Sequence, residues 1–156
     1  MDLRELDADD IGILIEYRVK LLSLLQGERT AAEVLQLQEE LAIQMQTAFD
    51  EGTCIAFIAH ENTAVAGIGL MTIQSRPGSF KNPGGRFGYI MNMFTEPAYR
   101  RRGVCTAILN ALLAKGTAKG ITAYELHASK EGAFVYAQND FNLHSEPTYR
   151  RYFTNQ

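Results

Sequence analysis

The segment Tyr99–Thr106, YRRRGVCT, holds residues that could bind a phosphate group. A strand is expected to end at Thr95 and a helix to begin near Gly103, with no acidic residue in its first turn. The opening turn of a helix presents unpaired backbone N–H groups and a partial positive charge, so it attracts anions. Three arginines at 100–102 add positive charge beside these amides. The alternative is a solvated basic turn in which glycine serves only the chain geometry.

Two motifs in this region resemble those of the GCN5-related N-acetyltransferase (GNAT) superfamily. Its signature, Q/R-x-x-G-x-G/A at a helix start, is matched by Arg100, Gly103 and, imperfectly, Cys105. One strand later, HASKEGAFVYAQNDF supplies the second motif, S-x-x-G-x-x-x-Y-x-x-x-x-F, through Ser129, Gly132, Tyr136 and Phe141. Two motifs in the right order are far more specific than either alone. The resemblance covers nearly the whole chain and is tightest over residues 87–141.

The resemblance implies a site for acetyl-CoA. In this superfamily the strand before the signature splays away from its parallel neighbour, and the strand's end pairs with the pantetheine amides. The amides of the following helix start hold the pyrophosphate. No metal is expected. The residues expected to bind the cofactor are Met93, Phe94, Thr95, Arg100, Arg101, Arg102, Gly103, Val104, Cys105, Thr106, Ser129 and Gly132.

Tyr136 matches the superfamily tyrosine whose hydroxyl protonates the departing thiolate, so the resemblance implies that it is the general acid. A phenol keeps its proton at neutral pH and can give it to a developing anion. The alternative is a half-buried ring that only packs its short helix on the sheet. A reactive thiolate at Cys105 is also conceivable, because a helix N-terminus and nearby arginines lower a thiol pKa. It is the less favoured route, since the superfamily transfers the acyl group directly.

The general base is missing from its usual place. Many members of the superfamily carry a glutamate early in the strand that leads to the signature, and here that position is Tyr89. No Asp or Glu lies between Arg86 and Thr95. An amine must lose a proton before it attacks, so Tyr89, Asn92 and His127 are the candidates to act as the base or to orient a water.

The acceptor pocket is expected to form from Tyr17, Arg18 and the loop 75–86, because acceptor pockets in the superfamily are built from the N-terminal helices and this loop. Arg76, Lys81 and Arg86 could face a carboxylate-bearing acceptor or simply solvate the loop. These residues do not identify the acceptor.

Hydrophobic periodicity and turn signals predict the elements that position these residues. We expect one domain over 1–156 with an α/β (α+β) fold, in which helices flank a mostly antiparallel sheet splayed at one parallel strand pair. A capping box is expected at Thr30 and Glu33. The expected order is a strand at 3–6, a helix from caps at 7–10 to Gly27, a helix from Thr30 to Gly52, hairpin strands at 53–60 and 63–74, a loop at 75–86, a strand at 87–95, a helix from Gly103 to Lys119, a strand at 121–127, a helix at 131–139, and a turn at 145–147 between two short strands.

Composition narrows the function classes. The 156 residues are 46% hydrophobic and 21% charged, which is typical of a soluble cytoplasmic domain, and no apolar run is long enough to span a membrane. The net charge is −3 without a basic stripe, so a nucleic-acid partner is not expected. Two distant cysteines offer neither a zinc motif nor a disulfide framework.

The function expected from these residues is acetyl transfer from acetyl-CoA to a small-molecule amine, with a homodimer as an open option. Two other functions use the same residues. One is a non-catalytic acyl-CoA-binding or sensing module on the same fold. The other is a nucleotide-binding protein, which is less favoured because the sequence lacks both G-x-x-x-x-G-K-S/T and a G-x-G-x-x-G after the first strand.

Overall fold

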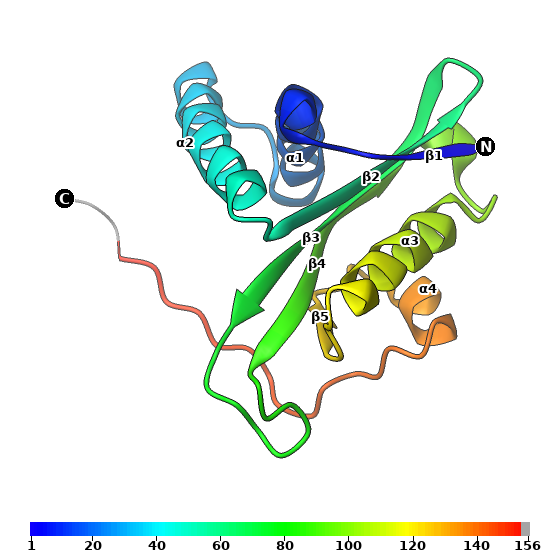
Figure 1. The fold of residues 1–156 in the computed structure, drawn as a ribbon. Helices are drawn as coiled ribbons and strands as arrows, with labels where there is room; N and C mark the ends of the chain where they lie inside the picture. Colours follow the sequence, from blue (N-terminus) through cyan, green and yellow to red (C-terminus); the bar gives the residue numbers. More distant parts are fainter. Residues whose placement is uncertain (154–156) are drawn as a thin grey trace.

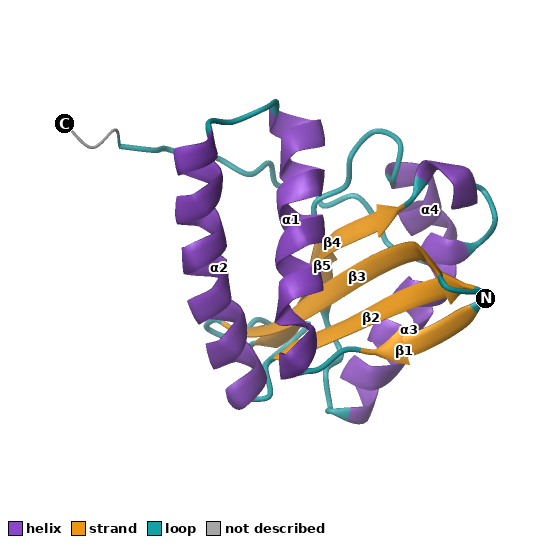
Figure 2. Ribbon diagram, turned by 90° about the horizontal axis from the view of Figure 1, so that it is seen from above, coloured by secondary structure: helices purple, strands orange, loops and turns teal. Residues whose placement is uncertain are grey.

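A five-stranded sheet in the order β1-β2-β3-β4-β5 separates two helical layers (Figure 1). Helices α1 and α2 cover one face of the sheet, and α3 and α4 cover the other (Figure 2). The computed structural model describes residues 1–153. The elements are β1 (Asp2–Glu5), η1 (Ala8–Asp10), α1 (Ile11–Gln26), α2 (Ala31–Asp50), β2 (Cys54–Glu61), β3 (Ala64–Ser75), β4 (Arg86–Thr95), η2 (Pro97–Tyr99), α3 (Val104–Ala118), β5 (Tyr124–Leu126) and α4 (Ala133–Gln138).

Capping residues that the sequence predicts lie at the starts of η1 and α2. Asp7 and Asp10 form a capping box at η1, which leads directly into α1. Thr30 caps α2, accepting from the Glu33 backbone N–H at 3.2 Å, while Glu33 Oε2 accepts from the Thr30 N–H at 2.9 Å. Gly27 ends α1 with a φ of 89°, which an L-residue rarely adopts. These local signals therefore place α1 and α2 close to the expected residues.

The strand pairing confirms the expected mixed sheet. β1 to β4 pair antiparallel in sequence order, and β4 pairs parallel with β5. The predicted hairpin joins β2 and β3 through Asn62 and Thr63, with Asn62 at a φ of 56°. The loop between β3 and β4 is held by its own hydrogen bonds, including one from the Arg76 N–H to the Gly85 carbonyl oxygen at 3.0 Å.

Two strand predictions are wrong. The strand expected at 121–127 is only Tyr124–Leu126, because the Ile121 N–H bonds to the Gly116 carbonyl oxygen at the end of α3 and its side chain is buried there. The two short strands expected in the tail do not form within the described residues. The main chain of 142–153 makes no backbone hydrogen bond to residues 1–153, and Leu143, Tyr149, Tyr152 and Phe153 are exposed. In Figure 1 this orange-to-red segment runs from α4 across the view, past the lower end of the sheet, to the opposite side of the molecule.

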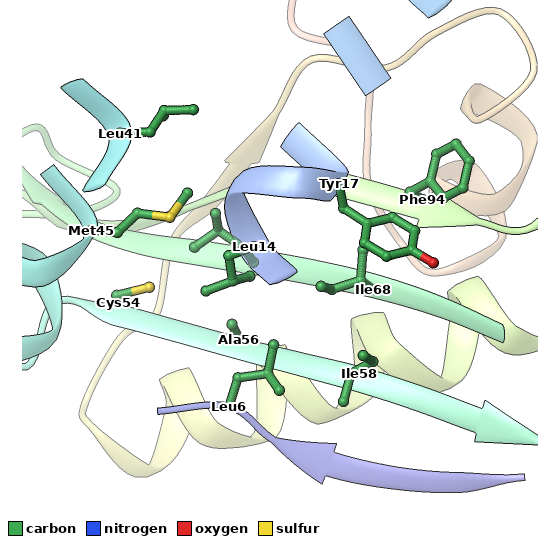
Figure 3. Close-up of a cluster of buried hydrophobic side chains, with 11 residues drawn as sticks. Leu6, Leu14, Tyr17, Leu41, Met45, Cys54, Ala56, Ile58, Ile68 and Phe94 are labelled. Atoms are coloured by element: carbon green, nitrogen blue, oxygen red, sulfur yellow. The ribbon is translucent and has the colours of Figure 1, made fainter. Parts of the chain in front are cut away.

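Each face of the sheet has its own apolar core. Figure 3 shows the cluster between the sheet and α1 and α2, where Leu14 and Tyr17 reach down from α1 toward the strands. The second cluster lies under α3, and Tyr136 and Phe141 pack against it. The buried residues of the second cluster are Ile55, Ala59, Ala66, Met71, Ile90, Val104, Ile108, Leu109 and Leu112. The two cores fix β4 between α1 and α3, which is the arrangement that the site requires.

Gly67 allows α3 to lie close to β3, which leads to a stability prediction. A Cβ at this position would lie 2.8 Å from the Phe94 carbonyl oxygen and 2.8 Å from Val104 Cγ1. Because backbone cannot step aside cheaply, Gly67→Ala should lower the free energy of unfolding by about 1–3 kcal/mol. Gly12→Ala in α1 is the matched control, since nothing lies within 4 Å of its Cβ position. Thermal denaturation should show a lower Tm than that of the wild type for Gly67→Ala but not for Gly12→Ala. Equal melting temperatures of the two variants would contradict the close contact.

Candidate active site

The sheet opens between β4 and β5. Parallel pairing joins only Gly88–Ile90 to Tyr124–Leu126, while β4 continues to Thr95 beside β3 alone. The last five residues of β4, Met91–Thr95, therefore have no strand on the β5 side. Open main-chain donors and acceptors on such an edge can pair with an extended ligand in the manner of an added strand. Met93, Phe94 and Thr95 lie on this open part, and the Thr95 carbonyl oxygen accepts a hydrogen bond from Arg100 Nε at 3.3 Å.

A β-bulge at Asn92 lies at the point where β4 leaves β5. Leu70 pairs with Met91 and Ile68 pairs with Phe94, so two residues of β4 lie opposite Gly69. Asn92 adopts a φ of 58° and is 3% exposed. Its Nδ2 donates to the Leu14 carbonyl oxygen of α1 at 3.5 Å, and its Oδ1 is buried without a partner among residues 1–153. Asn92 thus lies beneath α1 and ties that helix to the bulge.

The turn after β4 presents a row of free backbone N–H groups. Arg101 and Gly103 have φ values of 60° and 80°, and α3 begins at Val104. Within the described chain, no N–H from Arg101 to Thr106 has a hydrogen-bond acceptor. The first turn of α3 carries no acidic residue, and nothing lies within 4 Å of the Cβ position of Gly103. A helix start of this kind, open on its outer side, is suited to an anion such as a pyrophosphate.

The arginines of this turn have different partners. Arg102 Nη2 lies 2.6 Å from Glu61 Oε1, and its Cζ lies 5.4 Å from the centroid of the Tyr99 ring. Arg100 is held by the Thr95 carbonyl oxygen. Arg101 makes no ion pair or side-chain hydrogen bond to residues 1–153. Positive charge at the turn thus comes from the helix start, Arg100 and Arg101, whereas Glu61 offsets the charge of Arg102; Arg100 and Arg102 also hold the turn in place.

Tyr136 lies on α4, beside the first turn of α3. Ser129 Oγ accepts from the Gly132 N–H at 3.1 Å and shapes the start of α4. A Cβ at Gly132 would lie 3.1 Å from the Tyr136 ring, so this glycine lets the ring pack closely. Burial, with a smaller contribution from the neighbouring Cys105, raises the pKa of Tyr136 well above its ordinary value. The phenol therefore keeps its proton at neutral pH, and its hydroxyl has no hydrogen-bond partner in the described structure.

The thiol of Cys105 behaves differently from a reactive thiolate. Its side chain is half-buried, and burial raises its pKa above the ordinary value. The lowering that a helix N-terminus and nearby arginines could cause is thus not what the structure indicates. Cys105 remains a neutral thiol at neutral pH, which disfavours a covalent acyl-cysteine route.

Tyr89 and His127 lie together on the α1 face of the opening, although the chain separates them widely. The Tyr89 hydroxyl is 2.7 Å from His127 Nδ1, and the two rings meet edge to face. His127 Nε2 lies 3.4 Å from the Thr148 hydroxyl, which comes from the C-terminal segment. Of the three candidates for proton removal, the structure thus joins Tyr89 to His127, while Asn92 is engaged with α1.

A network of a hydrogen bond and an ion pair joins Glu96, which follows β4, to α1. The sequence did not indicate this network. Glu96 Oε1 accepts from the Tyr17 hydroxyl at 2.8 Å and pairs with Lys20. The Lys20 ammonium lies 5.0 Å from the centroid of the Phe94 ring. Burial alone would raise the pKa of Glu96, but the hydrogen bonds from Lys20 and Tyr17 outweigh it and lower the pKa. The i, i+3 spacing of Tyr17 and Lys20 was visible in the sequence, whereas their common partner was not.

The residues expected to line the acceptor pocket have different surroundings in the structure. Tyr17 and Arg18 lie on the side of α1 that faces the sheet. Arg76 forms an ion pair with Glu125 at 2.8 Å and stacks on Phe87.

None of the helices described is long and apolar enough to cross a membrane. Residues 1–153 contain no group of three or more His, Cys, Asp or Glu side chains that could hold a metal ion.

Solved structures share this architecture. A predicted acetyltransferase from Clostridium acetobutylicum, solved with acetyl-CoA, is 27% identical with a TM-score of 0.85, over 96% of this chain and 95% of the other. A GCN5-related N-acetyltransferase from Ralstonia eutropha JMP134 has a TM-score of 0.83 at 22% identity, over 96% and 97%. An aminoglycoside acetyltransferase from an uncultured soil metagenomic sample, solved with sisomicin, shares the fold at 14% identity with a TM-score of 0.67, over 99% and 96%.

Sequence comparison identifies the family. None of the curated proteins matches the chain significantly in sequence. Residues 19–152 match the model of the Acetyltransferase (GNAT) family. This range contains both the free amides of 101–106 and Tyr136, and it spans most of the chain, so the protein belongs to the GNAT family of acetyltransferases.

Proposed function

We propose that the protein transfers an acetyl group from acetyl-CoA directly to the amine of a small molecule. The observation that carries this proposal is the position of the free amides of 101–106 at the point where β4 leaves β5, with the Tyr136 phenol beside them. The structural similarity to a predicted acetyltransferase solved with acetyl-CoA supports the choice of acyl donor.

The open edge of β4 and the turn before α3 would bind different parts of acetyl-CoA. The main chain of Met93, Phe94 and Thr95 would pair with the pantetheine amides, and the N–H groups of Arg101 to Thr106 would donate to the pyrophosphate. Arg101 would add charge at the outer side of the turn. Ser129 and Gly132 would act by shaping the start of α4 and seating the Tyr136 ring.

Tyr136 would act as the general acid. When the amine attacks the thioester carbonyl, the C–S bond breaks and the sulfur leaves with its electron pair. The Tyr136 hydroxyl would give its proton to this sulfur, which suits a phenol whose raised pKa keeps it protonated beforehand. The neutral thiol of Cys105 supports direct transfer over an acyl-cysteine intermediate.

Tyr89 and His127 would remove the proton from the incoming amine. His127 Nδ1 and the Tyr89 hydroxyl form one hydrogen-bonded pair on the α1 face, and either can hold a water between itself and the amine. The two free cysteines fit a reducing compartment, so we place the protein in the cytoplasm.

Incubation of the protein with acetyl-CoA and a panel of amines, with release of free CoA thiol as the readout, tests this function. We expect thiol release that depends on both protein and amine, and mass spectrometry should find the acetylated amine. Tight CoA binding without thiol release for any amine would instead favour an acyl-CoA-binding module. The absence of an acidic residue in β4 gives that second function its support.

We also propose that the protein forms a homodimer in which residues 142–153 of each protomer pack on the other protomer. This segment exposes four large apolar side chains and makes no backbone hydrogen bond to residues 1–153, while the outer edge of β5 is unpaired. Exposed apolar chain beside an open strand edge favours exchange between identical copies. Deletion of residues 149–156 should convert a dimer to a monomer in light scattering coupled to size-exclusion chromatography. A full-length chain that is monomeric at high concentration would contradict the proposal.

A further inference from the structure

Arg18 is a half-buried cation on the inner side of α1. Leu14, Tyr17, Arg18 and Leu21 follow the i, i+3, i+4, i+7 spacing of one helix face, and this face packs on the sheet. Leu14 and Tyr17 are buried, and they contact β4 through Asn92 and Phe94. Arg18 therefore lies partly buried on the side of α1 that faces the sheet.

No carboxylate of residues 1–153 neutralises Arg18. The five ion pairs of this region do not include it, and its guanidinium makes no side-chain hydrogen bond there. The acidic groups on this side have other partners: Glu96 binds Lys20 and Tyr17, and Glu125 binds Arg76. A guanidinium that is partly removed from water without a counter-ion is unfavourable for the folded chain alone.

Tyr17, the residue before Arg18, contacts Phe94 in the part of β4 that has no β5 neighbour. Burial lowers the pKa of Arg18, as expected for a guanidinium that is partly removed from water. Tyr89 is paired with His127 at the last residues of β4 that still contact β5. Arg18 thus lies on the α1 side of the sheet, the side on which Tyr89 and His127 also lie.

We infer that Arg18 forms a binding subsite for a carboxylate of the acceptor, so that the protein selects amines that also carry a carboxylate, such as amino acids. The inference rests on the proposed function and names the substrate class for the same site. The planar guanidinium can hold a carboxylate through two parallel hydrogen bonds, and the carboxylate supplies the missing counter-charge. The amine of the same molecule would then lie near Tyr89 and His127.

The test compares each L-amino acid with its own carboxamide, which keeps the amine and side chain but removes the charge. Wild-type kcat/KM should be higher for the acid. Arg18→Gln should lower kcat/KM for the acid by roughly 10- to 100-fold and change that for the carboxamide by less than about twofold. Arg18→Lys should restore part of the preference, because it keeps the charge but not the planar geometry. Arg29→Gln, at an exposed arginine between α1 and α2, is the control and should behave as wild type.

Thermal denaturation gives a readout that does not need turnover. Without ligand, Arg18→Gln should melt no lower than wild type, because it removes an unpaired charge from a half-buried position. With CoA present, a preferred amino acid should raise the Tm of the wild type but not that of Arg18→Gln. Its carboxamide should raise neither.

Two results would overturn the carboxylate subsite. One is an equal loss of kcat/KM for acids and carboxamides in Arg18→Gln, which would make Arg18 a positioning residue. The other is a wild-type protein that neither prefers the acids nor gains Tm from them. Failure of the proposed function has a different outcome, because amino acids would still raise the Tm through Arg18 while no amine released CoA thiol.

Discussion

Replacing Tyr136 by phenylalanine should lower kcat by about 100-fold, the low end for loss of a general acid, because a thiol leaves fairly well unaided. CoA affinity should stay within about twofold of wild type, since the hydroxyl interacts with charge that develops only during the reaction. The Tm should also stay close to that of the wild type, because the ring keeps its packing on Gly132 and Phe141. The hydroxyl has no hydrogen-bond partner to lose among residues 1–153. Steady-state kinetics, calorimetric titration with CoA and thermal denaturation of one variant measure all three.

Tyr124→Phe is the matched control for Tyr136→Phe. The Tyr124 hydroxyl bonds the Leu113 and Ile121 carbonyl oxygens at 3.2 and 3.1 Å, so its loss should lower the Tm while kcat is retained. The two tyrosines thus predict opposite patterns for the same chemical change. If Tyr136→Phe turned over as fast as wild type with a good acceptor, Tyr136 would serve packing alone.

Gly103→Asp should weaken CoA binding far more than Gly103→Asn. Both side chains have nearly the same shape and tolerate the left-handed backbone that Gly103 adopts, with its φ of 80°. Only aspartate places a negative charge against the pyrophosphate. Allowing for solvent screening, we expect a difference of about 2 kcal/mol between the two variants, or roughly 30-fold in Kd. Calorimetric titration with CoA measures both values.

The salt dependence provides a control for Gly103. The difference in CoA affinity between Asp and Asn should shrink as ionic strength rises, because the repulsion is electrostatic. Equal affinity of the two variants at low salt would place the pyrophosphate elsewhere. Equal weakening of both would indicate that Gly103 is needed for space rather than for charge.

The local parts of the fold could be predicted from sequence because their causes lie within a few residues. The capping box of Thr30 and Glu33 and the Gly27 helix end both follow from neighbours in the chain. The failure at the tail has the opposite cause. Two short strands are expected there, but a strand forms only when another backbone pairs with it, and residues 142–153 make no backbone hydrogen bond within residues 1–153.

The candidate site also has parts that could be predicted from the sequence and parts that could not. The free amides near Gly103 are a property of any helix start, so the sequence indicated them directly. The partners of Arg102 and Arg76 could not be predicted, because Glu61 and Glu125 are distant in the chain and meet them only in the folded protein. The pairing of Tyr89 with His127 likewise depends on the register of β4 with β5.

The bulge at Asn92 also resets which side chains belong to which face of β4. Before it, Ile90 packs under α3 and Met91 packs under α1; after it, Met93 packs under α3 and Phe94 under α1. In a regular strand, residues that are five apart point to opposite faces. Because Asn92 adds one residue to the count, Tyr89 and Phe94 share the α1 side. One extra residue in β4 therefore decides which face the side chains of 93–95 occupy, since removing it would move Phe94 to the face opposite Tyr89.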